Sequence, residues 1–218
     1  MLFTCYFIYY RFNLIFYQMN KEDKQIIAKN IIIISGPSGA GEDSIIKVLL
    51  KDLPAEKIIT TTTREMRAED KEGVSYYFVS KDEFKKGIVN NQFIEYAKEY
   101  NDNYYGVSER ELMRIAKSGN IGIWKIEYKG VTTAKKLFPN IKAIFISASL
   151  EDLKGRIKKR DNLPKTYLEE RMTYTKEWLK HKNIYDYEVE NSDGNLDQAI
   201  ENCKKILKNL YLVDKSRN

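Results

Sequence analysis

A glycine-rich turn follows an apolar run near the start of the chain, in the stretch IIIISGPSGAGEDSIIKVLL at residues 31–50. Glycines in such a turn let backbone N–H groups converge on an anion at the start of a helix, which is how loops of this kind bind nucleotide phosphates. The sequence therefore predicts a phosphate-binding loop made of Gly36, Pro37, Ser38, Gly39, Ala40, Gly41, Glu42, Asp43 and Ser44.

The charge at the end of this loop is opposite to the charge that the motif usually has. A phosphate loop normally continues with Lys, which contacts the β- and γ-phosphates, and then with Ser or Thr, which contacts Mg²⁺. Here Glu42 and Asp43 occupy those positions, and Ser44 follows one residue late. Acidic residues in a first helical turn contribute about 0.3–1 kcal/mol each through the helix dipole. A loop that has lost its function and kept acidic caps is therefore an open alternative.

The segments around the loop alternate between strand and helix patterns, which predicts an α/β fold with a mainly parallel sheet. The continuous apolar run at 30–35 is typical of a buried parallel strand, and the stretches 121–127 and 141–148 are predicted to be further central strands. A final amphipathic helix has its apolar face between Leu196 and Leu210. Short strand-like pieces between residues 60 and 108 indicate a small inserted subdomain. Capping boxes are expected at Ser80 with Glu83, Ser108 with Glu111 and Thr166 with Glu169.

Composition and charge restrict the classes of protein. The 218 residues suffice for one domain with a substantial core, and the net charge of +6 favours anionic ligands such as nucleotides. Cys5 and Cys203 form no disulfide or metal-binding pattern, so we expect a cytoplasmic protein. The apolar pieces of residues 1–18 are interrupted by Arg11 and too short to span a bilayer, so stable membrane insertion is not expected. An alternative start at Met19 and a peripheral membrane anchor are the two interpretations of this segment.

Three further stretches, TTTTREMRAEDKEGVSYYFVS, FIEYAKEYNDNYYGVS and LKGRIKKRDNLPKTYLEER, together with the loop, resemble the guanylate kinase family. The resemblance covers about residues 31–210, with the motifs in the family's order and spacing. It implies a P-loop NTPase-type parallel sheet with flanking helices over residues 31–212. An inserted NMP-binding subdomain is implied at about 60–108 and a helical lid at about 154–172. Residues 1–30 are then an N-terminal extension, and 213–218 are a tail.

The resemblance also implies an acceptor site for GMP. Arg64 and Arg67 would bind the GMP phosphate, for which a guanidinium is suited because it contacts phosphate oxygens in a bidentate manner. Glu95 would accept hydrogen bonds from the N1–H and the 2-amino group of guanine. The other implied GMP-binding residues are Thr60, Tyr76, Tyr105, Ser108 and Glu127. Val107 replaces the Ser or Thr that is usual in the family, so we expect an altered pocket and a less certain base selectivity there.

The lid of the family contains arginines that bind the transferring phosphoryl group. Their counterparts here are Arg156 and Arg160, four residues apart on one helix face, and Arg171. A basic run of this kind is otherwise a solvated helix face. The matched spacing favours phosphate binding.

Lys125, in the strand IGIWKIEYKG, stands where the resemblance implies an aspartate that helps to hold Mg²⁺. The loop has thus lost a cation and gained an anion, while the neighbouring strand has done the reverse. Open α/β sheets bind ligands at the carboxyl ends of their strands, so these positions should face one another. We hypothesise a charge swap in which Lys125 contacts the phosphates as a catalytic residue and Glu42 and Asp43 coordinate Mg²⁺. The alternative is a structural ion pair that fills an inactive site.

These features predict an enzyme that transfers a phosphoryl group from ATP to GMP, with Mg²⁺ as the cofactor, to give ADP and GDP. Two alternatives stay open. One is a catalytically inactive guanylate-kinase-like module that binds a phosphorylated ligand, and the other is a kinase with a different phosphate acceptor. No nucleic acid partner is expected, and both a monomer and a homo-oligomer are compatible with the sequence.

Overall fold

The computed structural model describes residues 19–98, 102–161 and 165–212. Its central feature is a five-stranded sheet in which every neighbouring pair of strands is parallel. In spatial order the strands are β2 (Ala55–Lys57), β7 (Ile121–Trp124), β1 (Ile31–Ser35), β8 (Lys142–Ser147) and β9 (Tyr187–Glu190). The predicted α/β fold with a parallel sheet is confirmed.

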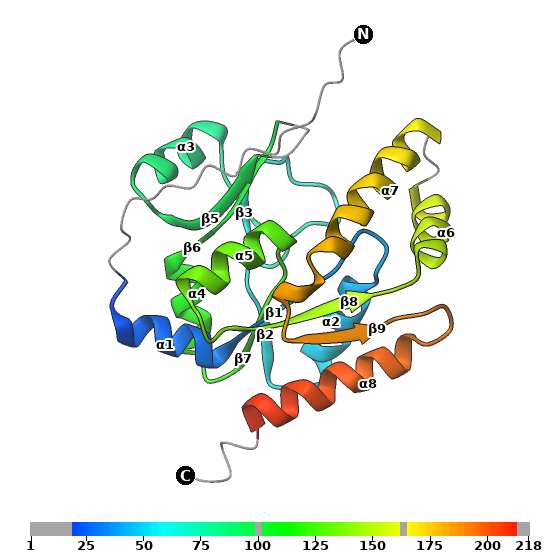
Figure 1. Ribbon diagram of the computed structural model, residues 1–218. Helices are drawn as coiled ribbons and strands as arrows, with labels where there is room; N and C mark the ends of the chain where they lie inside the picture. The colour runs from blue at the N-terminus through cyan, green and yellow to red at the C-terminus, as the bar shows by residue number, and fades with distance from the viewer. Residues whose placement is uncertain (1–18, 99–101, 162–164, 213–218) are drawn as a thin grey trace.

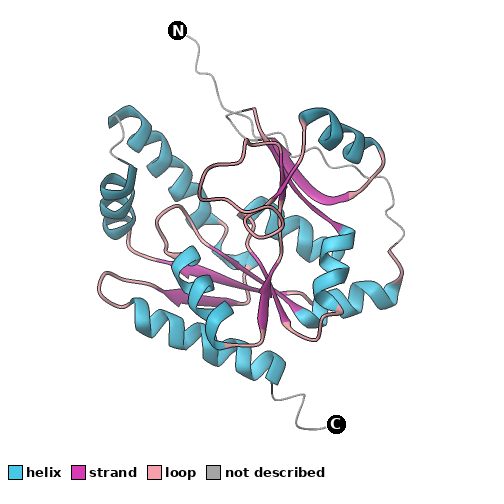
Figure 2. Ribbon diagram, turned by 180° about the vertical axis from the view of Figure 1, so that it is seen from behind, coloured by secondary structure: helices cyan, strands magenta, loops and turns pink. Residues whose placement is uncertain are grey.

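Both faces of the central sheet are covered by helices, as Figure 2 shows. Side chains alternate along a strand, so the four isoleucines of β1 are divided between two apolar clusters, and all four are fully buried. Ile32 and Ile34 pack in the cluster of α2 (Glu42–Asp52) and α8 (Leu196–Leu207). Ile31 and Ile33 pack in the cluster of α1 (Lys21–Asn30), α4 (Glu109–Ala116) and α5 (Tyr128–Leu137).

The inserted segment forms a second, four-stranded sheet of its own. The strand order is β4 (Tyr77–Phe78), β3 (Thr61–Thr62), β6 (Tyr104–Ser108) and β5 (Phe93–Lys98). The connecting helix α3 (Lys81–Val89) begins with the predicted reciprocal capping box of Ser80 and Glu83. Phe84 from this helix stacks on Phe93 with ring centroids 4.2 Å apart, which fixes α3 on the sheet.

Helices α6 (Leu150–Asp161) and α7 (Lys165–Lys180) lie across from this second sheet, with the glycine-rich loop between the two (Figure 1). Two short helices complete the structure, η1 (Lys182–Ile184) and η2 (Lys208–Leu212). Within the described ranges no helix is both long and apolar enough to span a bilayer. Residues 1–18 of the predicted N-terminal extension, the tail at 213–218 and the side chain of Thr166 lie outside the described residues, whereas 21–30 of that extension form α1.

One strand is shorter than predicted, and the difference matters for the site. β7 ends at Trp124, whereas the apolar run predicts a strand to residue 127. The chain leaves the sheet here because Glu127 is already the N-cap of α5. Lys125 and Glu127 therefore lie in the connection at the carboxyl edge of the sheet, where open α/β folds bind ligands.

Candidate functional site

A cavity of ≈ 870 Å³ opens at this edge of the central sheet. Its walls come from the segments after β1 and β7, from the second sheet with its loops, and from α7. It brings together most of the predicted site residues, namely Gly36, Ser38, Gly39, Gly41, Glu42, Asp43, Ser44, Thr60, Arg64, Arg67, Tyr76, Glu95, Tyr105, Lys125, Glu127 and Arg171.

The glycines of the loop have the backbone conformation that close approach to an anion requires. Gly39 and Gly41 have φ values of +88° and +90°, in the left-handed region that favours glycine. A Cβ on Gly36 would lie 2.4 Å from the backbone oxygen of Ile146, so a larger residue would not fit there. α2 begins directly after Gly41, and the first N–H groups of a helix have no partner within that helix. The loop can therefore bind phosphate through its backbone.

Arg156 holds the loop from behind. Its guanidinium donates to the backbone oxygen of Gly39 at 3.2 Å and to that of Asn191 at 2.8 Å, and it is paired with Asp193. The Asn191 side chain donates in turn to the backbone oxygen of Ala40 at 2.7 Å. Arg156 is not among the cavity-lining residues. These contacts fix the loop's conformation, and the role of Arg156 in binding the transferring phosphoryl group stays a prediction.

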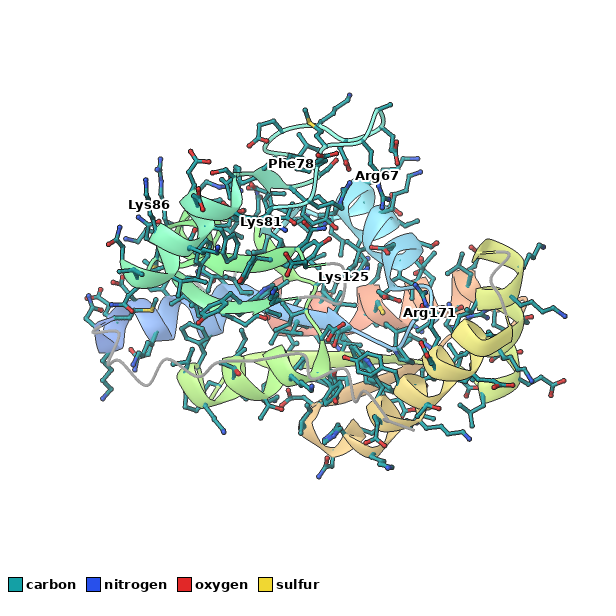
Figure 3. The ribbon with its side chains drawn as sticks, turned by 90° about the horizontal axis from the view of Figure 1, so that it is seen from above. Arg67, Phe78, Lys81, Lys86, Lys125 and Arg171 are labelled. Carbon is teal, nitrogen blue, oxygen red and sulfur yellow. The ribbon has the colours of Figure 1, made fainter. Side chains whose placement is uncertain are left out.

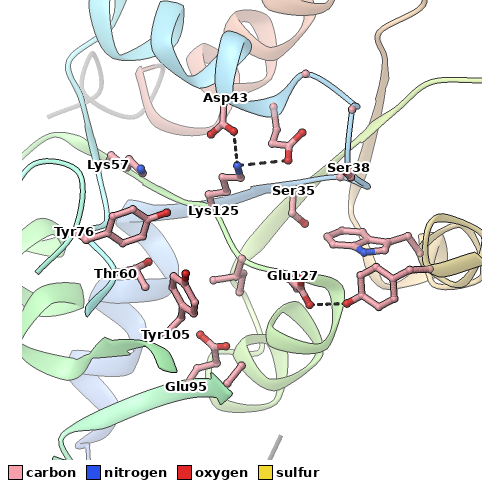
Figure 4. A pocket seen from close by; sticks show the side chains of 18 of the residues that line it. Ser35, Ser38, Asp43, Lys57, Thr60, Tyr76, Glu95, Tyr105, Lys125 and Glu127 are labelled. Atoms are coloured by element: carbon pink, nitrogen blue, oxygen red, sulfur yellow. Dashed lines mark hydrogen bonds and ion pairs between the residues drawn. The ribbon is translucent and has the colours of Figure 1, made fainter. Parts of the chain in front are cut away.

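Lys125 lies against the acidic start of α2 (Figure 4). Its Nζ is 2.6 Å from Oδ2 of Asp43 and 3.5 Å from Oε1 of Glu42. The Glu42 side chain is only 12% exposed and that of Asp43 is 76% exposed, so the pair extends from the interior to the cavity. The predicted juxtaposition of Lys125 with the acidic loop is confirmed.

Burial and charge act in opposite directions on these groups. Burial raises the pKa of the Glu42 carboxyl, and Lys125 opposes this only in part. Burial also lowers the pKa of Lys125, but the carboxylates of Glu42 and Asp43 outweigh that effect and place its pKa above the ordinary value. Lys125 is therefore a stable ammonium group at the phosphate loop.

The two arginines and two tyrosines predicted for the acceptor phosphate come together on the opposite wall. Arg64 donates to Asp70 at 2.7 Å, and its guanidinium carbon is 5.3 Å from the centroid of the Tyr76 ring. Tyr76 meets Tyr105 edge-on with centroids 6.1 Å apart. Burial and the neighbouring Tyr105 raise the pKa of Tyr76, which therefore remains a hydroxyl donor. Arg67, Lys125 and Arg171 all line the cavity, so it has cations from three separate segments of the chain (Figure 3).

Carboxylates occupy the far end of the cavity. Glu95 on β5 and Glu127 after β7 both line it, together with Thr60 (Figure 4). The hydroxyl of Tyr174 on α7 donates to Oε2 of Glu127 at 2.6 Å, which fixes this carboxylate and ties α7 to the cavity. An end with two carboxylates suits a ligand edge that presents N–H donors, such as that of guanine.

The predicted lid arginines are not equivalent. Nη1 of Arg171 donates to Oγ of Ser38 at 3.1 Å, so this guanidinium reaches the phosphate loop from α7. Arg160 belongs to α6, but its side chain lies outside the part of the structure that is described. Its predicted role stays a prediction.

Four other predicted positions contribute no wall to the cavity. Ser108 is the N-cap of α4 and accepts from the N–H of Glu111, as its capping pattern indicates, and its contact with GMP stays a prediction. Val107 is 1% exposed and packs in the apolar core, and the predicted change to the base pocket at this position stays a prediction. Pro37 closes the loop's turn by accepting from the N–H of Ala40, and Ala40 is fully buried.

Known proteins of one family match this chain over most of its length. The family model described as guanylate kinase matches residues 28–210. This chain belongs to the guanylate kinase family. The guanylate kinase of Caldanaerobacter subterraneus is 37% identical, over 81% of this chain and 85% of its own. That of Rickettsia prowazekii is 39% identical, over 81% and 89%. The crystal structure of guanylate kinase from Anaplasma phagocytophilum has the same fold, with a TM-score of 0.65 and 24% identity over 84% of this chain and 87% of that one.

Guanylate kinases are phosphotransferases that generally use ATP with Mg²⁺. Among the described residues there is no group of three or more His, Cys, Asp or Glu side chains that could enclose a metal ion. Mg²⁺ in nucleotide enzymes is commonly bound through one or two carboxylates, with phosphates and water supplying the other ligands. The exposed carboxylate of Asp43, next to the loop, fits that mode of binding.

Several residues that line the cavity were not predicted from the sequence. Tyr174 and Trp178 enter from α7, and Lys57 enters from the end of β2. The two aromatic residues follow Arg171 at spacings of three and seven, which places all three on one helix face. This spacing in the sequence could have predicted that they enter the cavity with Arg171. Lys57 ends a strand of three residues, AEK, which has no recognisable pattern of its own.

Proposed function

We propose that this chain transfers the γ-phosphoryl group of ATP to the phosphate of GMP, giving ADP and GDP. The observation that supports this best is the arrangement of one continuous cavity. A phosphate loop with Lys125 forms one wall, and Arg64, Tyr76 and Tyr105 form the facing wall. Two phosphorylated ligands could meet between them.

The acceptor would be oriented by both ends of its site. Arg64 and Arg67 would bind the GMP phosphate, with Tyr76 and Tyr105 donating their hydroxyls to its remaining oxygens. Glu95 would accept from the guanine N1–H and 2-amino group, a pair of donors that adenine lacks at this edge. Phosphate binding and base choice are thus assigned to different residues.

The donor would be held by the loop glycines and by cations on two sides. The N–H groups of the Gly36–Gly41 loop would bind the β-phosphate, while Lys125 and Arg171 would contact oxygens of the γ-phosphoryl group. Phosphoryl transfer needs positioning and charge neutralisation more than covalent chemistry, so no strong base is required. The carboxylates of Asp43 and Glu42 would hold Mg²⁺, which would supply positive charge that neutralises part of the phosphate charge.

In this mechanism the Lys125 ammonium exchanges partners. Without nucleotide it is bound to Asp43. A γ-phosphate with more than one negative charge would attract the ammonium more strongly, which would free the Asp43 carboxylate from its ion pair with Lys125. The exposed position of Asp43 leaves room for this exchange.

A coupled assay of ADP release tests the proposal. Purified protein would be given ATP and Mg²⁺ with GMP, dGMP, AMP, CMP or UMP as acceptor. We expect turnover with GMP and dGMP, and rates with AMP lower by about 10²-fold or more, because Glu95 would be left without its donors. The proposal would be contradicted if none of the five acceptors were phosphorylated, or if all five were phosphorylated at similar rates.

A further inference from the structure

Lys57 lines the cavity together with Lys125, and the mechanism above does not use it. It is the last residue of β2, in parallel register with Ile123 of β7, two residues before Lys125. Two neighbouring parallel strands therefore each present a lysine at the same edge of the sheet. Figure 4 shows the Lys57 ammonium directed toward the space occupied by Lys125 and Asp43, and Lys57 lines the cavity.

No hydrogen bond or ion pair of the Lys57 ammonium is found among the described residues. Its nearest specific contact is with the ring of Tyr76, whose centroid is 5.9 Å from Nζ. By contrast, Lys125 has Asp43 and Glu42, and Arg64 has Asp70. A half-buried ammonium without an anionic partner is costly, and such groups are concentrated where a ligand supplies the counter-charge.

The position of Lys57 along the cavity indicates which anion it would meet. On one side is Tyr76, a predicted ligand of the acceptor phosphate, and on the other is Asp43 at the donor end. A cation between the two walls faces the point where donor and acceptor phosphates come closest. Burial lowers the pKa of the Lys57 ammonium, and the positive charge of Lys125 lowers it further. The carboxylate of Asp43 raises it by less, so the protein itself does not fully compensate the charge of Lys57.

We propose that Lys57 is a catalytic residue that binds the phosphoryl group during its transfer, as a second cation beside Lys125. The inference rests on the proposed function. An oxygen of the GMP phosphate forms the new bond to the γ-phosphorus, the bond from that phosphorus to the bridging oxygen breaks, and its electron pair leaves with ADP. Lys57 keeps its proton throughout and donates hydrogen bonds to the equatorial oxygens of the group in transfer.

Kinetics of three variants test this role. Lys57→Met keeps the aliphatic stem that packs near Tyr76 and removes only the charge, whereas Lys57→Arg keeps a cation. Lys86→Met on α3 is the control, because this exposed lysine points away from the cavity (Figure 3). We expect Lys57→Met to lower kcat for GMP phosphorylation by about 10²-fold with a change in KM of less than about threefold. Lys57→Arg should recover at least about a tenth of the wild-type kcat, and Lys86→Met should match the wild type.

A binding measurement keeps this inference separate from the proposed function. Inorganic pyrophosphate should raise the melting temperature of the wild type and of Lys86→Met, and raise that of Lys57→Met much less. If the wild type turns over no acceptor, the proposed function fails, and the pyrophosphate effect alone decides whether Lys57 binds phosphate. If Lys57→Met folds poorly, Lys57→Gln replaces it in both experiments. A neutral variant with a kcat within about threefold of an active wild type, or with an unchanged pyrophosphate effect in an inactive one, overturns the proposal.

Discussion

Replacing Lys125 with Met separates the charge of this side chain from its packing. Losing the ion pair with Asp43 should reduce the free energy of unfolding only slightly, whereas losing the pair with Glu42 should reduce it more. Asp43 is 76% exposed, and a pair of that kind contributes about 0–1 kcal/mol. Glu42 is 12% exposed and would lose its neighbouring cation, which costs about 1–3 kcal/mol when a buried polar group is left unsatisfied. In a chain of this size each kcal/mol lowers the melting temperature by about 2–4 °C, so Lys125→Met should melt a few degrees lower.

The effect on catalysis should be much larger than the effect on stability. A unit charge about 4 Å from another contributes about 4 kcal/mol at an effective dielectric constant of about 20. If the greater part of that energy acts only in the transition state, and each 1.36 kcal/mol is tenfold in rate, kcat should fall by about 10²- to 10³-fold. The KM for GMP should stay within about threefold, because Arg64 and Tyr76 on the facing wall are unchanged.

Steady-state ADP release with varied GMP measures both constants, and thermal melting measures the stability. Adding Glu42→Gln to Lys125→Met removes the buried charge that the first change leaves unpaired. The double variant should regain melting temperature without regaining kcat. A Lys125→Met protein that keeps its kcat within about threefold of the wild type would refute the assignment of this lysine to the phosphates.

Three further results are expected. Glu95→Gln should lower kcat/KM for GMP by about 10²-fold and reduce the preference for GMP over AMP, measured with both acceptors in the ADP-release assay, whereas an unchanged preference would remove Glu95 from base recognition. Tyr174→Phe should raise the KM for GMP by about 3- to 10-fold with little change in kcat, because Glu127 would lose the hydroxyl 2.6 Å away, and an unchanged KM would show that this contact is dispensable. Raising the pH should lower kcat already below pH 10.5, the ordinary pKa of a lysine, because burial and Lys125 lower the pKa of Lys57. The other groups that Lys57 faces are Asp43 and Tyr76. Over the same pH window the unfolded chain binds the proton more tightly, so this group's contribution to the free energy of unfolding should rise as kcat falls, and parallel changes in the two would contradict the assignment.

The parts of the fold that the sequence predicted best are those with a repeating physical pattern. The β1 run of isoleucines is buried on both faces, and the glycines after it adopt φ values that few other residues tolerate, so strand and loop are both evident from residue types. Strand β2 was missed because three residues, two of them charged, show no periodicity. Lys57 was missed with it.

Three positions named in the sequence analysis do not line the cavity, and the reason is the direction of their side chains. Arg156 has the spacing of a lid residue, but the position of α6 turns its guanidinium to the rear of the loop. Val107 follows Gly106, which lines the cavity, and in a strand the next side chain points to the opposite face. Ser108 was given two functions in the prediction, and the helix cap is the one that the structure contains.

Exchanging the charges between loop and strand tests the central claim of a relocated cation most directly. Glu42→Lys places a second cation beside Lys125, and Lys125→Asp places a third carboxylate beside Glu42 and Asp43, so each single variant should lose about 10²-fold or more in kcat. The double variant E42K/K125D again has one lysine facing one carboxylate, and we expect it to recover at least about tenfold over the better single variant. The account would be contradicted if the kcat losses of the two single variants simply multiplied in the double variant, or if either single variant were as active as the wild type.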